Sequence, residues 1–218
     1  MSMDGNHIIG HGYPDLISSK LGYDNIENMP KFINKGVSGD SIADLYSRLN
    51  SDVLKNKPNI ISILIGINDV CKGFGLPYKM PTKKYINIYK LMLEDIRAVL
   101  KNVKIVICEP FFMELEPNRE KPFEFTPYAY CEKDFPINIR EEYMENVRKE
   151  LAYMQKELKS FAQENECIYV PLQDKFFECA KRTHPEYLVW DTTHPTIVGH
   201  ELIAREWLRI VGEEIENG

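Results

Sequence analysis

A chain of 218 residues, 44% of them apolar, is long enough for one globular domain, and we expect a single domain over residues 1–218. The net charge of −6, from 27 basic and 33 acidic side chains, argues against a basic nucleic-acid-binding surface. The longest apolar run, residues 60–67, is far shorter than the roughly 20 residues of a membrane-spanning helix. We therefore expect neither nucleic acid nor membrane as a partner.

The N-terminus and the cysteines give no sign of secretion. Residues 1–12 lack the basic and apolar regions of a signal peptide. Five cysteines are scattered without CxxC spacing, which fits reduced thiols better than a disulfide framework or a zinc site. These features predict a cytoplasmic protein without a metal.

Strand and helix patterns alternate along the chain. Strands are predicted at residues 31–35, 59–66, 103–108 and 167–171, and helices at 42–57, 82–99, 144–161 and from about residue 196 onward. This alternation predicts an α/β fold of the flavodoxin-like type, with a short parallel sheet between two layers of helices. In such sheets ligands bind at the carboxyl ends of the strands.

The segment 109–135 interrupts this rhythm. It is rich in proline and aromatic residues and has neither helical nor strand periodicity. Because it directly follows a predicted strand, we expect a long loop over the active-site face. Its aromatic side chains are compatible with a sugar or with an acyl chain, so they do not identify a substrate.

Three short motifs lie where predicted strands run into loops, at residues 36–39 (GVSG), 66–69 (GIND) and 191–195 (DTTHP). An Asp three residues before a His can hold the imidazole in one tautomer. An Asn amide and a glycine N–H can both donate to a developing oxyanion, an interaction worth roughly 3–4 kcal/mol per donor. The residue types therefore fit acyl transfer.

The three motifs, in this order and on these elements, make the chain similar to the SGNH, or GDSL-like, family of serine hydrolases. The resemblance covers most of the chain and implies the family's α/β/α fold. It implies that His194 is the general base, that Asp191 orients it, and that Asn68 and the backbone N–H of Gly39 form the oxyanion hole. It also implies that Asp69 holds the loop after Asn68 in place and that no cofactor is needed.

Each of these residues also fits an ordinary structural role when taken alone. Asn68 and Gly39 suit turns, and Asp191 suits a helix cap. The other histidines are poorer bases; His184, for example, has a lysine three residues before it instead of an aspartate. We expect these other histidines to be structural or exposed.

The tripeptide Gly39-Asp40-Ser41 looks like the family's nucleophile block, but its position contradicts this. In the family a second strand and a glycine loop separate that block from the Gly-x-Asn-Asp motif, and residues 42–65 leave no room for them. The tripeptide therefore overlaps the oxyanion-glycine block. We predict that Ser41 is the N-cap of the following helix.

The family's own Gly-Asp-Ser block should precede Met1, because residues 1–6 match the stretch that follows it. We therefore expect the first strand and the nucleophile to be missing, so that residues 31–35 and 59–66 keep unpaired strand edges. Two explanations stay open: a product truncated at an internal Met codon, which we favour, and a relative that lost its nucleophile. A substitute role for Ser2 is a third and weaker alternative.

The function implied by the resemblance is hydrolysis of small carboxylic esters, with acetylated sugars as a family-level expectation. Without the attacking hydroxyl we expect little or no activity from these 218 residues. The alternative is a non-catalytic relative that binds carbohydrate or acyl ligands in the remaining cleft. A nucleotide-binding protein is disfavoured, since neither GxGxxG nor GxxxxGK[ST] is present.

Overall fold

A short parallel sheet lies at the centre of the fold. The computed structural model describes residues 10–72, 78–115 and 137–216. Its strands are β1 (Ile60–Leu64), β2 (Lys104–Cys108) and β3 (Ile168–Val170), in the order β1-β2-β3. All neighbouring pairs are parallel, with Ile60 opposite Lys104 and Val106 opposite Ile168. The predicted α/β class with a short parallel sheet is confirmed.

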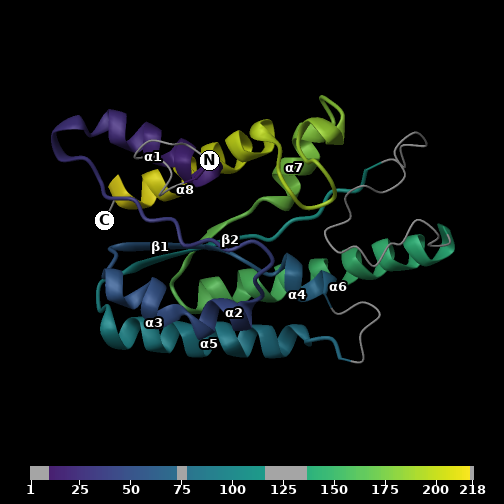
Figure 1. The fold of residues 1–218 in the computed structure, drawn as a ribbon, viewed down its shortest axis with the longest axis horizontal. Coiled ribbons are helices and arrows are strands. Elements are labelled where there is room, and N and C mark those ends of the chain that lie inside the picture. The colour runs from purple at the N-terminus through teal and green to yellow at the C-terminus, as the bar shows by residue number, and fades with distance from the viewer. Residues whose placement is uncertain (1–9, 73–77, 116–136, 217–218) are drawn as a thin grey trace.

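Helices cover both faces of the sheet (Figure 1). One layer contains α1 (Tyr13–Asp24), α7 (Gln173–Ala180) and α8 (Ile197–Glu216). The other contains α2 (Ile42–Ser47), α3 (Leu49–Asp52), α4 (Ile67–Cys71), α5 (Thr82–Val99) and α6 (Ile137–Glu164). Short 3₁₀ turns are η2 (Ile26–Asn28), η3 (Leu54–Asn56) and η4 (Pro185–Tyr187). None of the helices in the described ranges combines the length and apolarity that crossing a bilayer requires.

The alternation of side chains along β2 divides the core into two parts. Ile105 and Ile107 face the core shared with α5 and α6. Val106 and Cys108 face the core shared with α1 and α8. Because successive side chains of a strand point to opposite faces, an apolar strand of this kind is stable only between two helical layers.

The strand predicted at residues 31–35 does not form. These residues are outside every strand of the sheet and are mostly exposed. Within the part of the chain that the structure describes, β1 pairs with β2 alone, so its other edge has no strand beside it. An extended segment becomes a strand only when a neighbour completes its hydrogen bonds, and apolar pattern alone does not supply that neighbour.

The helix predicted at residues 42–57 is broken into α2, α3 and η3. The break falls at Arg48, whose backbone leaves the helical region. Its guanidinium bonds Asp40 at 2.6 Å and Asp52 at 2.6 Å, and it also donates to the carbonyl of Lys35 at 2.7 Å. Arg48 thus connects the broken helix to the loop that contains Gly39.

Candidate active site

Asp191 and His194 lie on a tight loop between η4 and α8. Val189 and Pro195 form an antiparallel bridge at the base of this loop. Next to the bridge, the amide of Trp190 donates to the carbonyl of His194 at 2.8 Å. The bridge closes the loop and brings the Asp191 and His194 side chains together.

The Asp191 carboxylate and the His194 imidazole form a directed pair. Nδ1 of His194 lies 2.7 Å from Oδ2 of Asp191, and Oδ1 of Asp191 accepts from the backbone amides of Thr193 at 2.7 Å and His194 at 2.9 Å. The Asp191 side chain is 4% exposed, whereas that of His194 is 57% exposed. A buried, fully bonded carboxylate therefore holds an accessible imidazole.

The pKa shifts of this pair follow from the same contacts. Burial raises the pKa of Asp191, but the hydrogen bonds from His194 and from backbone amides outweigh it, so the pKa lies below its ordinary value. The hydrogen bond to Asp191 raises the pKa of His194, and burial opposes this only in part. The pair thus favours a charged imidazolium, as a general base requires once it has taken a proton.

The loop that contains Gly39 is directly connected to α4, which contains Asn68. Nδ2 of Asn68 donates to the carbonyl of Asp40 at 2.8 Å, and the ammonium of Lys72 donates to the carbonyl of Gly39. Gly39 has a φ of 85°, a backbone conformation that strongly favours glycine. The two predicted oxyanion-hole residues therefore belong to one structural unit.

Asp69 joins this unit to α2. Both of its carboxylate oxygens lie 3.1 Å from the backbone amide of Ile42 and so tie α4 to the start of α2; a role in holding the loop after Asn68 stays a prediction. Asp69 is buried, and burial raises its pKa to about 7, although the Ile42 hydrogen bond counteracts the shift. This carboxyl is therefore protonated in the folded state at pH values where it would be ionised in an unfolded chain.

Replacing Asp69 with asparagine should remove one pH-dependent part of stability. With a pKa of about 7 when folded and 3.8 ordinarily, wild-type Asp69 makes the free energy of unfolding fall as pH rises through that window. At about 1.4 kcal/mol per pKa unit, the fall amounts to at most about 4 kcal/mol. The measurement is urea unfolding of wild type and Asp69→Asn between pH 4 and about pH 8. The contribution of Asp69 is the difference between the two proteins in how their free energy of unfolding changes with pH.

The exposed position Asp24→Asn is the control for that experiment and should follow the wild-type pH profile. An Asp69→Asn profile parallel to wild type would mean that Asp69 titrates normally.

Ser41 is the N-cap of α2, as predicted. Its hydroxyl accepts from the amide of Asp44 at 3.4 Å, while Oδ2 of Asp44 accepts from the Ser41 amide at 2.9 Å. The hydroxyl also donates to Oδ2 of Asp44 at 2.6 Å. This reciprocal arrangement is a capping box, and it gives the hydroxyl a structural partner.

The substitution Ser41→Ala should lower the free energy of unfolding by about 1 kcal/mol, because it removes the cap. A serine-directed fluorophosphonate should not label Ser41, and both results together define it as a cap. Ser47→Ala is the control, because that exposed hydroxyl bonds only a carbonyl of its own helix, and it should change stability by less than about 0.5 kcal/mol. Labelling at Ser41 would contradict the assignment.

A cavity of about 130 Å³ lies beside residues that neighbour both groups in sequence. It is lined by Tyr13, Leu64, Ile65, Ile67, Pro110, Phe111, Thr193, Pro195, His200 and Ile203. The lining includes Ile67, which precedes Asn68, and Thr193, which precedes His194, but it does not include Asn68, Gly39, Asp191 or His194 themselves. His200 has a structural role at its edge, where Nδ1 accepts from the Tyr13 amide at 3.3 Å.

The first residues of the predicted 109–135 loop are held firmly against this site. The side-chain amide of Gln173 pairs with both backbone groups of Phe112, at 3.0 and 2.9 Å. The amide of Met113 then donates to the carbonyl of Thr192, next to Asp191, at 2.8 Å. Glutamine at 173 has no motif around it, so the sequence contained no signal for this role. Residues 116–135 of the loop lie outside the described residues.

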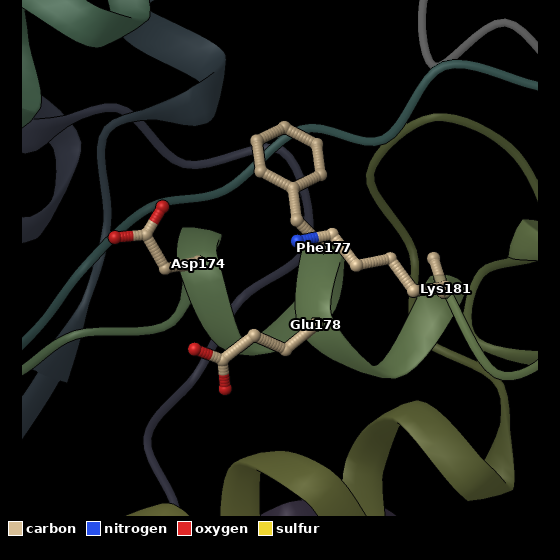
Figure 2. Close-up of a pocket in the computed structure, with 5 residues that line it drawn as sticks. Asp174, Phe177, Glu178 and Lys181 are labelled. Carbon is tan, nitrogen blue, oxygen red and sulfur yellow. The ribbon is translucent and has the colours of Figure 1, made fainter.

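A broader hollow lies along α7, away from the predicted site residues. Asp174, Phe177, Glu178, Ala180 and Lys181 line it, and Figure 2 shows the side chains of Asp174, Phe177, Glu178 and Lys181 along this helix and its end. Because α7 and the residue directly after it supply the whole lining, the hollow is an open surface. In the described part of the chain, no group of three or more His, Cys, Asp or Glu residues has the arrangement of a metal site.

Comparisons with known proteins agree with this geometry. The sequence profile of the GDSL-like lipase/acylhydrolase family matches residues 1–207. An acetylxylan esterase from Geobacillus stearothermophilus is 29% identical over 208 residues, which cover 94% of this chain and 83% of that protein.

Solved structures with a similar fold include members of the same kinds of enzyme. A GDSL-like lipase from Parabacteroides merdae superposes with a TM-score of 0.78 at 26% identity, covering 96% of this chain and 85% of that one. A mutant of Axe2, an acetyl-xylooligosaccharide esterase from Geobacillus, superposes with a TM-score of 0.74 at 27% identity, covering 96% and 84%. The resemblance noted from the three motifs is confirmed: the chain belongs to the GDSL-like lipase/acylhydrolase family, and its fold and relatives are those of an SGNH-type esterase.

Proposed function

We propose that this protein hydrolyses small acyl esters, with acetylated sugars as the substrate class, through a Ser-His-Asp mechanism. In this mechanism His194 takes the proton of the attacking serine and later that of the water. Asp191 orients His194 and stabilises its charged form. The amide of Asn68 and the N–H of Gly39 stabilise the oxyanion of the tetrahedral intermediate.

The observation that carries the proposal is the Asp191–His194 pair. A 2.7 Å contact joins Nδ1 to a buried carboxylate and leaves the Nε2 side of the ring toward solvent. Among the described residues Nε2 has no hydrogen-bond partner, so it is available to a hydroxyl group. The Asn68–Asp40 contact supports the proposed oxyanion hole. It joins Asn68 to the residue next to Gly39, so both proposed donors belong to one structural unit.

Acetylated sugars are proposed on the strength of the Geobacillus stearothermophilus relatives. The curated protein is named an acetylxylan esterase, and Axe2 of that organism is named both an acetylxylan esterase and an acetyl-xylooligosaccharide esterase. Acetyl esters also suit the small cavity of about 130 Å³ beside Ile67 and Thr193.

The attacking serine is the part of the mechanism that these residues do not supply. Ser41 is engaged as a helix cap, and the family's Gly-Asp-Ser block occurs nowhere else in the sequence. Loss of the nucleophile in subtilisin costs roughly 10⁶-fold in turnover. We therefore expect little or no esterase activity from these 218 residues alone. A cytoplasmic location, inferred from the scattered thiols, is part of the same proposal.

The test compares two chains with aryl acetates and acetylated xylooligosaccharides as substrates. One is the 218-residue chain, and the other is extended upstream by a family strand that ends in Gly-Asp-Ser. Activity in the extended chain alone supports the proposal, because it shows that the remaining residues can serve an added serine. Activity in neither supports the alternative, a non-catalytic relative that binds carbohydrate or acyl ligands. Turnover by the 218 residues, with fluorophosphonate labelling of Ser2, would contradict the expectation that these residues supply no attacking serine.

A further inference from the structure

Arg48 binds both ends of the loop that contains Gly39. Its Nη1 donates to the carbonyl of Lys35 at 2.7 Å, before the loop, and its Nε donates to Oδ2 of Asp40 at 2.9 Å, after it. Nη2 lies 2.6 Å from the same Asp40 oxygen. Residues 36–39 therefore lie between two contacts of one guanidinium group. Arginine suits such a role, because its planar fork holds several donors in fixed directions.

The contacts of this guanidinium are partly shielded from water. The side chains of Arg48 and Asp40 are 20% and 14% exposed, whereas Arg205 in the ion pair with Glu201 is 79% exposed. Nη1 of Arg48 also donates to Asp52 at 2.6 Å, which fixes the group from the side of α3. Hydrogen bonds between two charged groups are shorter and stronger than neutral ones. The ends of the loop are thus held by a firm, partly buried contact.

The direction of the Gly39 N–H depends on how the loop is held. Among the residues that the structure describes, this N–H donates to no other group. The carbonyls of Gly39 and Asp40 accept from Lys72 and Asn68, so one side of the loop is tied to α4 and the residue after it. Glycine is free to adopt many backbone conformations, so Gly39 does not fix its own N–H. The contacts at the loop ends have to do this.

We propose that Arg48 is a positioning residue of the oxyanion hole. By holding Lys35 and Asp40 it aims the N–H of Gly39 at the carbonyl oxygen of the ester, and it does not itself contact the substrate. This inference rests on the proposed function, in which Gly39 and Asn68 are the oxyanion donors. Such donors stabilise the transition state because they are fixed in place before the negative charge develops.

A purely stabilising role for Arg48 predicts different results. Its loss would lower the free energy of unfolding, yet each folded molecule would keep its turnover. A positioning role predicts a lower kcat with little change in KM, because the oxyanion forms only after the ester has bound. The residues that line the cavity of about 130 Å³ belong to other segments than 35–40, so binding in that cavity should not depend on this loop.

The activity test uses the chain extended upstream by a strand that ends in Gly-Asp-Ser. At a temperature where circular dichroism shows the variants folded, Arg48→Ala should lower kcat on aryl acetates by about 10- to 100-fold and change KM by less than about twofold. Arg48→Lys should lose less, and added ethylguanidinium should restore part of the Arg48→Ala loss. Arg205→Ala, which removes an ion pair of α8 in the other helical layer (Figure 1), is the control and should keep its kcat.

A second substitution tests whether Arg48 acts through Asp40. In an Asp40→Ala background the ion pair is already absent, so Arg48→Ala should lower kcat by much less than it does in the wild-type background. The alanine keeps the backbone carbonyl to which Asn68 donates. Equal effects of Arg48→Ala in the two backgrounds would contradict a role through Asp40.

The 218-residue chain has a readout that needs no turnover. Isotope labelling of glycine alone limits the NMR spectrum to the amides of its 12 glycines. Arg48→Ala should shift or broaden the signal of Gly39, whereas Gly199, in α8, should keep its position. Arg205→Ala should leave the Gly39 signal unchanged.

Three results would overturn the proposal. They are an unchanged Gly39 signal in Arg48→Ala, a loss of stability in this variant with kcat per folded molecule intact, and a higher KM at constant kcat. The last would place Arg48 in substrate binding. Failure of the proposed function is distinguishable, because the extended wild-type chain would then be inactive while the Gly39 signal would still decide whether Arg48 holds the loop.

Discussion

Replacing Gly199 with alanine is expected to lower the free energy of unfolding by about 3 kcal/mol and to displace the Asp191–His194 loop. Gly199 lies in the first turn of α8, and a Cβ there would sit 2.1 Å from the carbonyl oxygen of Leu188. That carbonyl already accepts from the amide of Thr196 at 2.9 Å. The helix would have to move away, and the bridge beneath the catalytic pair would open.

Gly212→Ala is the matched control in the same helix. A Cβ at Gly212 has no heavy atom within 4 Å, so helix propensity alone applies and stability should rise by about 1 kcal/mol. Urea unfolding measures both variants, and the His194 signals in NMR spectra report on the loop. Similar urea midpoints for Gly199→Ala and Gly212→Ala would contradict this prediction. They would show that α8 can move away from Leu188 without loss of stability.

Replacing Asp191 with asparagine is expected to lower kcat by about 10⁴-fold in the serine-bearing chain, which is the chain extended upstream by a strand that ends in Gly-Asp-Ser. The corresponding Asp→Asn substitution of a serine protease has an effect of this size. Asparagine can still accept from the Thr193 amide, so the loop should keep its shape. Its NH₂ group would, however, face Nδ1 of His194, where a carboxylate now lies at 2.7 Å. The ring would then place its proton on Nε2, and it could not accept one from the serine.

The same substitution has a readout that needs no activity. The hydrogen bond to Asp191 raises the pKa of His194, so Asp191→Asn should lower that pKa in an NMR titration of the 218-residue chain. Since the base acts when neutral, activity in the serine-bearing chain should rise with pH through the His194 pKa. Asp174→Asn, an exposed carboxylate on α7, is the control. An unchanged His194 pKa in Asp191→Asn would exclude the pair as the catalytic dyad.

The short motifs predicted local contacts well, because those contacts join residues only a few positions apart. The Asp-x-x-His spacing led to a pair joined at 2.7 Å, and the position of Ser41 before a helix led to a capping box. Asp69 was expected to hold the loop after Asn68, whereas the structure gives it the amide of Ile42, 27 residues away, as its partner. The two correct predictions needed only the local backbone.

Predictions that depended on distant partners were weaker. Residues 31–35 have a strand-like sequence, but no strand lies beside them in the described part of the chain, and they stay outside the sheet. The single helix predicted at residues 42–57 is broken at Arg48, whose guanidinium binds groups before and after it. In both cases a tertiary contact, or its absence, outweighs local propensity.

The sequence by itself determined the α/β class, the family and the identity of the candidate residues, because periodicity and motif spacing are properties of the chain alone. Only the tertiary structure decided that Gln173 holds the loop beside Thr192, that Gly199 must lack a side chain, and that Trp190 lies exposed opposite His194. These features arise where segments far apart, or on two sides of a loop, meet in space. Such meetings depend on packing and register, which neither composition nor local pattern encodes.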